Sequence, residues 1–102
     1  MFFWYSSSVA KLDPAEIDHA LQSVALWRRN GEAIFRVFQF KDFRLAVLFV
    51  NRVADLAEAA QHHPDIDIRW NKVTLTLTTH DAGGLTGKDF DLARRCDSVS
   101  EA

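Results

Sequence analysis

An alternation of aliphatic and threonine side chains restricts the fold of this chain more than any other feature. Val73, Leu75 and Leu77 occupy every second position, and threonines fill the positions between and after them. Successive side chains of a β-strand point to opposite faces of the sheet, so this pattern predicts a strand with one apolar face. In the preceding segment, 65–69, isoleucines alternate with charged residues, and a turn at 70–72 would join the two strands into a hairpin.

Another hairpin is predicted upstream. Asn30-Gly31 separates two β-forming segments, and this dipeptide favours a tight hairpin turn because both of its residues accept positive φ angles. The strand that follows, at 33–40, has apolar side chains on both faces, including Phe35 and Val37 on the second face. An antiparallel sheet normally leaves one face in water, so we expect this face to contact another molecule, such as a second subunit.

The first and last helices are predicted from their capping residues. Asp13 can cap a helix at about 13–25, with a proline at its first position and Glu16 placed to complete a capping box. Thr86 can cap the last helix, which we expect to reach about Cys96.

The middle helix is predicted to be the longest. Asp42 can cap it, and apolar residues recur with the helical period from Phe43 to about Gln61. Pro64 disfavours helical geometry at the residue before it, so we expect the helix to end near residues 62–63.

The predicted elements define an α+β fold with the order αββαββα. It contains a four-stranded antiparallel sheet with the helices packed on one face. A chain of 102 residues is the usual size of a single domain, about 100–150 residues. We therefore expect one domain over residues 9–102, preceded by a flexible N-terminal segment, 1–8.

Charge and cysteine content exclude several classes of protein. The chain has 12 Lys and Arg residues against 14 Asp and Glu residues, and this balance argues against direct nucleic-acid binding, which depends on many contacts between cations and phosphates. The single cysteine, Cys96, excludes an internal disulfide framework and a cysteine-rich zinc site.

No apolar run approaches the ~20 residues of a membrane span. We expect a cytoplasmic protein, with the nucleus as an alternative, and no membrane contact.

Three histidines lie where functional sites commonly form. His62 and His63 lie at the predicted end of the middle helix, and His80 lies at a strand end. Histidine is the side chain best suited to proton transfer near neutral pH. Glu58 lies four residues before His62 on the same helix face, where its carboxylate could orient the imidazole. The break before Pro64 would let the two adjacent imidazoles converge, which a continuous helix does not allow.

Each of these residues also has a purely structural interpretation. The three histidines could be polar residues at the ends of elements, and His19 on the first helix is taken as a surface residue. Asp89 can complete a capping box with Thr86. Trp27 and Trp70 could each be core or rim aromatics.

A metal site is the competing chemistry. His62, His63, His80 and Asp89 could supply nitrogen and oxygen ligands. Adjacent histidines are an uncommon ligand spacing, however, and the chain lacks the pair of histidines at i and i+4 found in HExxH enzymes. We therefore predict that the protein uses no metal.

The spacing of these residues resembles the motif of the pterin-4a-carbinolamine dehydratase family. That motif begins with an acidic or similar residue, which is followed after three residues by His-His-Pro. An aromatic residue comes five or six residues later, a second His follows after nine more residues, and an Asp comes after that. This chain fills the positions with Glu58, His62-His63-Pro64, Trp70, His80 and Asp89. Segments 36–43 and 78–86 also look like the family's strand-to-helix junction and active-site loop. The resemblance spans about residues 12–97. Gln61 departs from the pattern, since the family usually has Asp or Asn there.

The resemblance implies dehydration of 4a-hydroxytetrahydrobiopterin to quinonoid dihydrobiopterin, in the recycling of tetrahydrobiopterin. On this basis we assign the acid and base roles to His62 and His80, and substrate binding and polarisation to His63. Glu58 would orient His62, and Asp89 would orient His80 or cap its helix.

The same resemblance implies a binding site for the edge of the pterin ring. The residues expected to form it are Gln61, His62, His63, Thr78, Thr79, His80, Asp81 and Trp27. The backbone of 61–63 and 78–81 would hydrogen-bond the ring, and Trp27 would wall the pocket. The pterin is the substrate, so no cofactor is expected.

Assembly and protein binding are further expectations. Members of the family form dimers or tetramers, so we expect a homodimer or homotetramer. Some members also act as dimerisation cofactors, or coactivators, of a homeodomain transcription factor. The alternative function is therefore a protein-binding role that uses the helix and sheet surfaces. A third interpretation is a catalytically idle homologue.

Overall fold

The computed structural model describes residues 10–101, which form three α-helices and four β-strands. In chain order the elements are α2 (Pro14–Leu21), the 3-10 turn η1 (Gln22–Val24), β1 (Arg28–Asn30), β2 (Ala33–Gln39), α3 (Phe43–Ala60), β3 (Asp65–Arg69), β4 (Lys72–Leu77), the 3-10 turn η2 (His80–Ala82) and α4 (Gly87–Ser100). The predicted α+β class and element order are confirmed. The predicted flexible segment, 1–8, lies outside the described residues.

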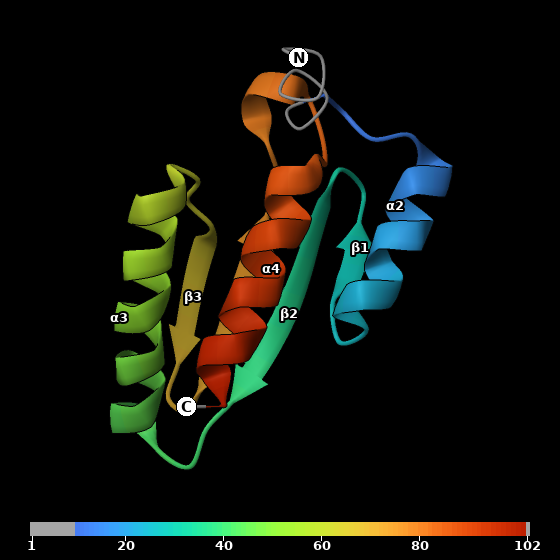
Figure 1. The fold of residues 1–102 in the computed structure, drawn as a ribbon. Coiled ribbons are helices and arrows are strands. Elements are labelled where there is room, and N and C mark those ends of the chain that lie inside the picture. The colour runs from blue at the N-terminus through green and yellow to red at the C-terminus, as the bar shows by residue number, and fades with distance from the viewer. Residues whose placement is uncertain (1–9, 102) are drawn as a thin grey trace.

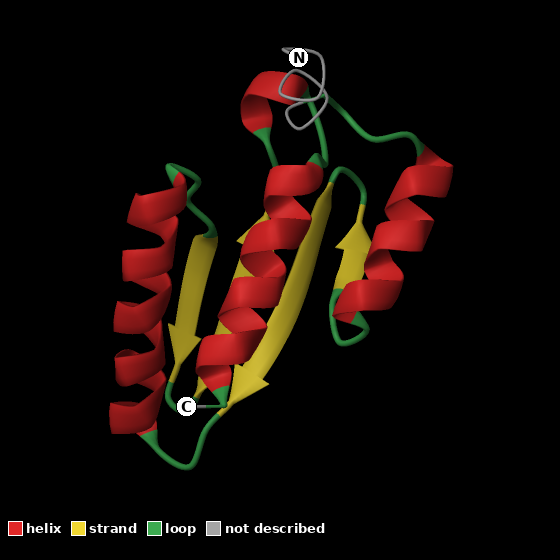
Figure 2. Ribbon diagram, viewed as in Figure 1, coloured by secondary structure: helices red, strands yellow, loops and turns green. Residues whose placement is uncertain are grey.

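The strands form one antiparallel sheet in the order β1-β2-β4-β3. Figure 1 shows α3 and α4 side by side over one face of this sheet, with α2 near β1. The helices all lie on that face, and the other face is left uncovered by them (Figure 2). This is the layering that the sequence predicts.

The central strand β4 has the predicted alternation. Val73, Leu75 and Leu77 are fully buried beneath the helices, whereas Thr74 and Thr76 are half-buried on the opposite face. A change of register by one residue would bury the threonines and expose the aliphatic side chains, so this pattern fixes the pairing of β4 with both of its neighbours.

The core lies between the sheet and the two long helices. Phe49 of α3 is buried, and its ring centroid lies 4.6 Å from that of Phe38 and 5.0 Å from that of Phe40. Phe90 of α4 is buried as well. Burial of one such side chain contributes roughly 1.5–3 kcal/mol to stability. These contacts hold α3 and α4 in fixed positions, and the candidate site lies where the last turn of α3 meets the first turn of α4.

The helix starts agree with the capping residues, while two of the ends differ from prediction. The Asp13 carboxylate accepts from the Glu16 N–H at 2.8 Å, and the Glu16 carboxylate accepts from the Asp13 N–H at 2.9 Å. The helix α2 ends at Leu21 because the next residues wind into the tighter turn η1. In contrast, α4 continues past the expected end to Ser100. None of the helices within 10–101 is long and apolar enough to cross a membrane.

The turn of the first hairpin differs from the prediction. Asn30 pairs with Ala33, so the two central residues of the turn are Gly31 and Glu32. Gly31 has φ 63°, whereas neither Asn30 nor Glu32 has a positive φ. The expectation that both residues of Asn30-Gly31 take positive φ is therefore wrong, although the hairpin itself is confirmed.

The uncovered face of the sheet keeps two apolar side chains of β2 in contact with water. Val37 is 51% exposed and Phe35 is half-buried. The expected contact of this face with another molecule remains a prediction.

Cys96 is expected to be inert towards thiol reagents in the folded protein. It is fully buried, and burial together with the nearby Asp97 carboxylate raises the pKa of its thiol to about 12. At pH 8 roughly one molecule in ten thousand would then carry the reactive thiolate. Labelling with a chromogenic disulfide should be slow in buffer and complete within minutes in urea. Rapid labelling of the folded protein would contradict this packing.

Candidate functional site

Gln61 ends α3 and sets the direction of the segment that contains the two adjacent histidines. It adopts the left-handed conformation, with φ 53° and ψ 42°. Its N–H donates to the Glu58 carbonyl at 3.3 Å, and the His62 N–H donates to the Ala57 carbonyl at 3.1 Å. These bonds satisfy carbonyls at the helix end. The helix therefore ends before both histidines, because the left-handed residue breaks it ahead of the proline.

Replacement of Gln61 by glycine is expected to raise the free energy of unfolding by up to about 1 kcal/mol. Left-handed geometry costs a residue with a Cβ about 1–2 kcal/mol. Loss of the side-chain hydrogen bond to the Glu58 carbonyl, 3.0 Å long, offsets part of the gain. Urea denaturation measures the change. The matched control is Gln22→Gly, since Gln22 has φ −64° and its replacement should lower stability. An equal loss in both variants would show that Gln61 is not strained.

His62 is held by a buried carboxylate from α4. Its Nε2 lies 2.6 Å from Asp89 Oδ1, and the side chains of His62 and Asp89 are 11% and 0% exposed. The second carboxylate oxygen accepts from the Thr86 N–H at 2.9 Å and from the Thr79 hydroxyl at 2.8 Å. Asp89 thus completes the predicted capping box of α4 and also fixes the orientation of the His62 imidazole, in the segment that follows α3.

The histidine–carboxylate pairs differ from those expected from the sequence. The Glu58 carboxylate lies 2.6 Å from Nε2 of His63, and both side chains are exposed. The expected pairing of Glu58 with His62 is therefore wrong, because the left-handed turn removes His62 from the helix face of Glu58. Asp89 contacts His62, so the expectation that it orients His80 is wrong as well.

His80 is presented by a short loop after β4. Thr79 forms an isolated bridge with Gly84, and the Thr79 N–H donates to the Gly84 carbonyl at 3.1 Å. Gly83, with φ 78°, closes the turn, and its N–H donates to the His80 carbonyl at 3.0 Å. The loop is thus closed on itself, and the exposed His80 side chain lies at its start.

One cleft of about 270 Å³ brings the three histidines together. The residues that line it are Gln61, His62, His63, Thr78, Thr79, His80, Asp81 and Lys88. Seven of these eight are residues that the sequence predicts for substrate binding. They come from the end of α3, the end of β4 with its loop, and the first turn of α4.

Trp27 lies elsewhere, and its expected place in the pocket wall is wrong. Its side chain is buried, its Nε1–H donates to Asp97 at 2.8 Å, and its ring meets Phe38 edge-on with centroids 6.0 Å apart. It is a core residue. Lys88 lines the cleft but was not predicted. The sequence feature that could have identified Lys88 is its position directly before Asp89, at the start of a helix that faces the site.

The cleft places imidazoles in different environments. His62 is nearly buried and bonded to a carboxylate, His63 pairs with an exposed carboxylate, and His80 is exposed. Such a set can donate and accept protons on a substrate held between them. Within residues 10–101, no group of three or more His, Cys, Asp or Glu side chains is arranged to hold a metal ion.

The chain matches a family model described as pterin 4 alpha carbinolamine dehydratase over residues 10–99. Two relatives are provisionally named pterin-4-alpha-carbinolamine dehydratase. The one from Roseiflexus castenholzii is 59% identical over 90 residues, which are 88% of this chain and 97% of the relative. The one from Nocardia farcinica is 53% identical over 89 residues, which are 87% and 94% of the two chains.

Two solved structures share the fold. A transcriptional coactivator/pterin dehydratase from Brucella melitensis superposes with a TM-score of 0.85 at 36% identity, covering 88% of this chain and 98% of that one. A pterin dehydratase-like protein identified as a RuBisCO assembly factor in the alpha-carboxysome has a TM-score of 0.64 at 25% identity, covering 74% and 90%.

Proposed function

Because the chain belongs to the pterin-4-alpha-carbinolamine dehydratase family, we propose that it converts 4a-hydroxytetrahydrobiopterin to quinonoid dihydrobiopterin and water. The observation that supports this most strongly is the cleft shared by His62, His63 and His80. The step would serve the recycling of tetrahydrobiopterin, and the pterin would be substrate rather than cofactor.

The reaction needs two proton transfers. The bond between C4a and the hydroxyl oxygen breaks as an acid protonates the departing hydroxyl, which leaves as water. A base takes the proton from N5, whose electron pair forms the double bond to C4a. Histidines from two segments of the cleft can supply both groups, and such transfers contribute about 10²–10⁴-fold to a rate.

The roles we propose are those that the family resemblance implies, and the contacts of each imidazole are consistent with them. His62 and His80 would be the proton-transfer groups, with Asp89 holding the His62 ring through Nε2, and with Nδ1 as the ring nitrogen that would face the substrate. His63, paired with Glu58, would bind and polarise the substrate. The backbone of 61–63 and 78–81 would hydrogen-bond the edge of the pterin.

The direct test is the decay of freshly generated 4a-hydroxytetrahydrobiopterin, followed by absorbance. We expect the protein to accelerate the decay well above the buffer blank, and to do so equally after exhaustive chelation. A rate equal to the blank would remove the enzyme assignment. Loss of the acceleration on chelation, with recovery on addition of a metal ion, would overturn the metal-free mechanism.

Protein binding is the second candidate function, and it is supported by exposed apolar side chains on α3. Phe43, Leu45 and Leu48 are 53%, 40% and 43% exposed. The Brucella melitensis neighbour is described as a transcriptional coactivator and the carboxysome neighbour as an assembly factor. A coactivator role would use this surface rather than the histidines. Pull-down with a candidate transcription factor should then be unaffected by His62→Ala, whereas the same change should strongly slow dehydration.

We propose that the chain assembles into a homodimer or homotetramer through the exposed apolar side chains of α3 and through β3, an edge strand of the sheet. All five residues of β3 are exposed, and an unpaired edge strand can pair with a second copy. We expect Leu48→Glu, on α3, or Ile68→Glu, on β3, to lower the mass measured by sedimentation. The control is Leu26→Glu, because Leu26 is 67% exposed outside both surfaces. An unchanged mass in both variants, or a monomeric wild type, would contradict the proposal.

A further inference from the structure

We infer that a second hollow beside the histidine cleft binds an anionic group on the substituent at C6 of the pterin. The inference rests on the proposed function, because the pterin ring must occupy the cleft for its substituent to reach the hollow. The ligand class is a pterin whose C6 substituent ends in a phosphate or a carboxylate. Lys88 and Arg95 would be the residues that determine this specificity.

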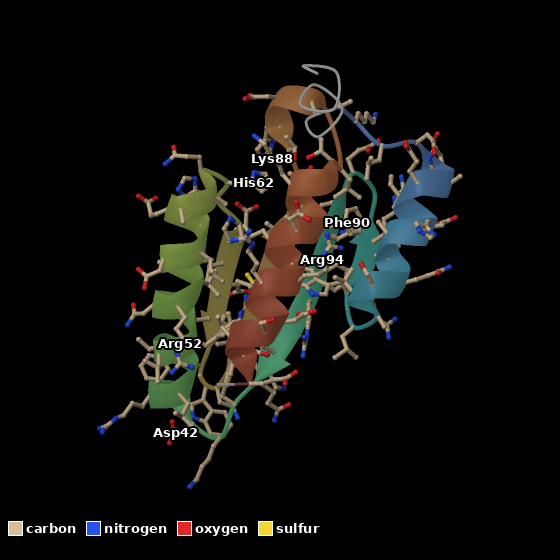
Figure 3. All side chains as sticks on the ribbon, in the orientation of Figure 1. Asp42, Arg52, His62, Lys88, Phe90 and Arg94 are labelled. Carbon is tan, nitrogen blue, oxygen red and sulfur yellow. The ribbon has the colours of Figure 1, made fainter. Side chains whose placement is uncertain are left out.

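The hollow lies between the last turn of α3 and the first half of α4 and has a volume of about 230 Å³. Its lining residues are Ala59, Ala60, His62, Lys88, Asp91, Leu92 and Arg95. It shares His62 and Lys88 with the histidine cleft, so the two spaces adjoin. Figure 3 shows these two side chains at the ends of α3 and α4 that face each other.

The charge balance of the hollow is positive. Its one carboxylate, Asp91, is already ion-paired with Arg94, whose guanidinium also donates to Ser23 at 2.8 Å. Among the described residues, Lys88 and Arg95 make no side-chain hydrogen bond or ion pair. Two cations thus remain for an anion that enters between them.

The space on the opposite side of the cleft has no Lys or Arg side chain in its lining. A hollow of about 330 Å³ adjoins the cleft at Thr78 and His80, and Glu32 is the one carboxylate in its lining. Glu32 is 3.5 Å from Lys11, an exposed pair that leaves this side neutral at most. A neutral substituent could lie in either hollow, but an anionic one is favoured only beside Lys88 and Arg95.

Small and apolar residues complete the fit. Ala59 and Ala60 leave the hollow open at the helix end, and Leu92 is a buried part of its lining. The carbon chain of a substituent can pack against these side chains while its terminal anion meets the cations. Longer side chains at 59 or 60 would fill the space.

The test compares the affinities of oxidised pterins, measured by the quenching of their fluorescence. The probes are neopterin, its terminal phosphate monoester, and 6-carboxypterin. For the wild type we expect at least one anionic probe to bind about 5- to 10-fold more tightly than neopterin, with a preference that weakens as salt rises. A preference for the phosphate ester or for the carboxylate would identify which anion the hollow accepts.

Two variants test the cations: the single variant Arg95→Gln, and the double variant that carries both Lys88→Gln and Arg95→Gln. In both, the affinities for anionic probes and for neopterin should become equal. The matched control is Arg44→Gln, because Arg44 is exposed in the first turn of α3, about 25 Å along the helix from the site. Equal affinity of wild type for all three probes would overturn the inference, as would a ratio retained in the double variant. Either result leaves carbinolamine dehydration measurable on its own, so failure here is distinct from failure of the proposed function.

Discussion

Replacement of His62 or His80 by alanine is expected to slow the dehydration of 4a-hydroxytetrahydrobiopterin by about 10²–10⁴-fold. Each change would remove one of the two proton-transfer groups while leaving the cleft open. His80 is exposed, so its loss should leave the free energy of unfolding nearly unchanged. His62 is more constrained, because its loss leaves Asp89 without one of its partners.

The decay assay with each variant at equal protein concentration measures this effect. The matched control is His19→Ala, because His19 is exposed on α2, away from the cleft. His63→Ala should instead raise KM more than it lowers kcat, since its proposed role is binding. Wild-type rates in both His62→Ala and His80→Ala would exclude histidine acid–base catalysis, even if the protein proved to be a dehydratase.

Replacement of Asp89 by alanine is expected to lower the free energy of unfolding by about 3–5 kcal/mol. The carboxylate is fully buried, and it accepts from the Thr86 N–H and the Thr79 hydroxyl while contacting His62. Alanine leaves these polar groups without their acceptor in a buried site. Asp89→Asn keeps one carbonyl oxygen but places an amide group opposite donors, so an intermediate loss is expected.

Urea denaturation measures the change, and the matched control is Asp91→Ala, two residues along the same helix. Asp91 is exposed and pairs with Arg94 at the surface, so its removal should cost less than about 1 kcal/mol. If Asp89→Ala cost no more than the control, the carboxylate would not hold this end of α4 together. Asp89→Asn should in addition slow dehydration in the protein that remains folded, because His62 loses its charged partner.

The parts of this fold that the sequence predicts correctly are governed by local rules. Asp13 and Thr86 cap helices because their side chains meet N–H groups within three residues. The alternation from Val73 to Leu77 defines a strand because the period of side chains along a strand is two. The hairpin at Gly31 follows from a residue that tolerates positive φ, although its central pair lies one residue later than expected.

The partners of the histidines could not be predicted in the same way. The i, i+4 spacing of Glu58 and His62 implies a shared face only if the helix continues, and the left-handed Gln61 stops it. The contact of His62 with Asp89 joins residues 27 positions apart and depends on how α3 and α4 pack. The burial of Trp27 against Phe38 likewise depends on tertiary packing.

The arrangement of the cleft depends on the first turn of α4, because Asp89 belongs to that turn and also holds His62. If the first turn of α4 frays, the same event that frees the Thr86 amide also frees the His62 ring. Local unfolding of this turn would then inactivate the protein, so one equilibrium would govern both the opening of the turn and the loss of activity. We therefore expect the rate of dehydration to fall at denaturant concentrations lower than those that unfold the sheet.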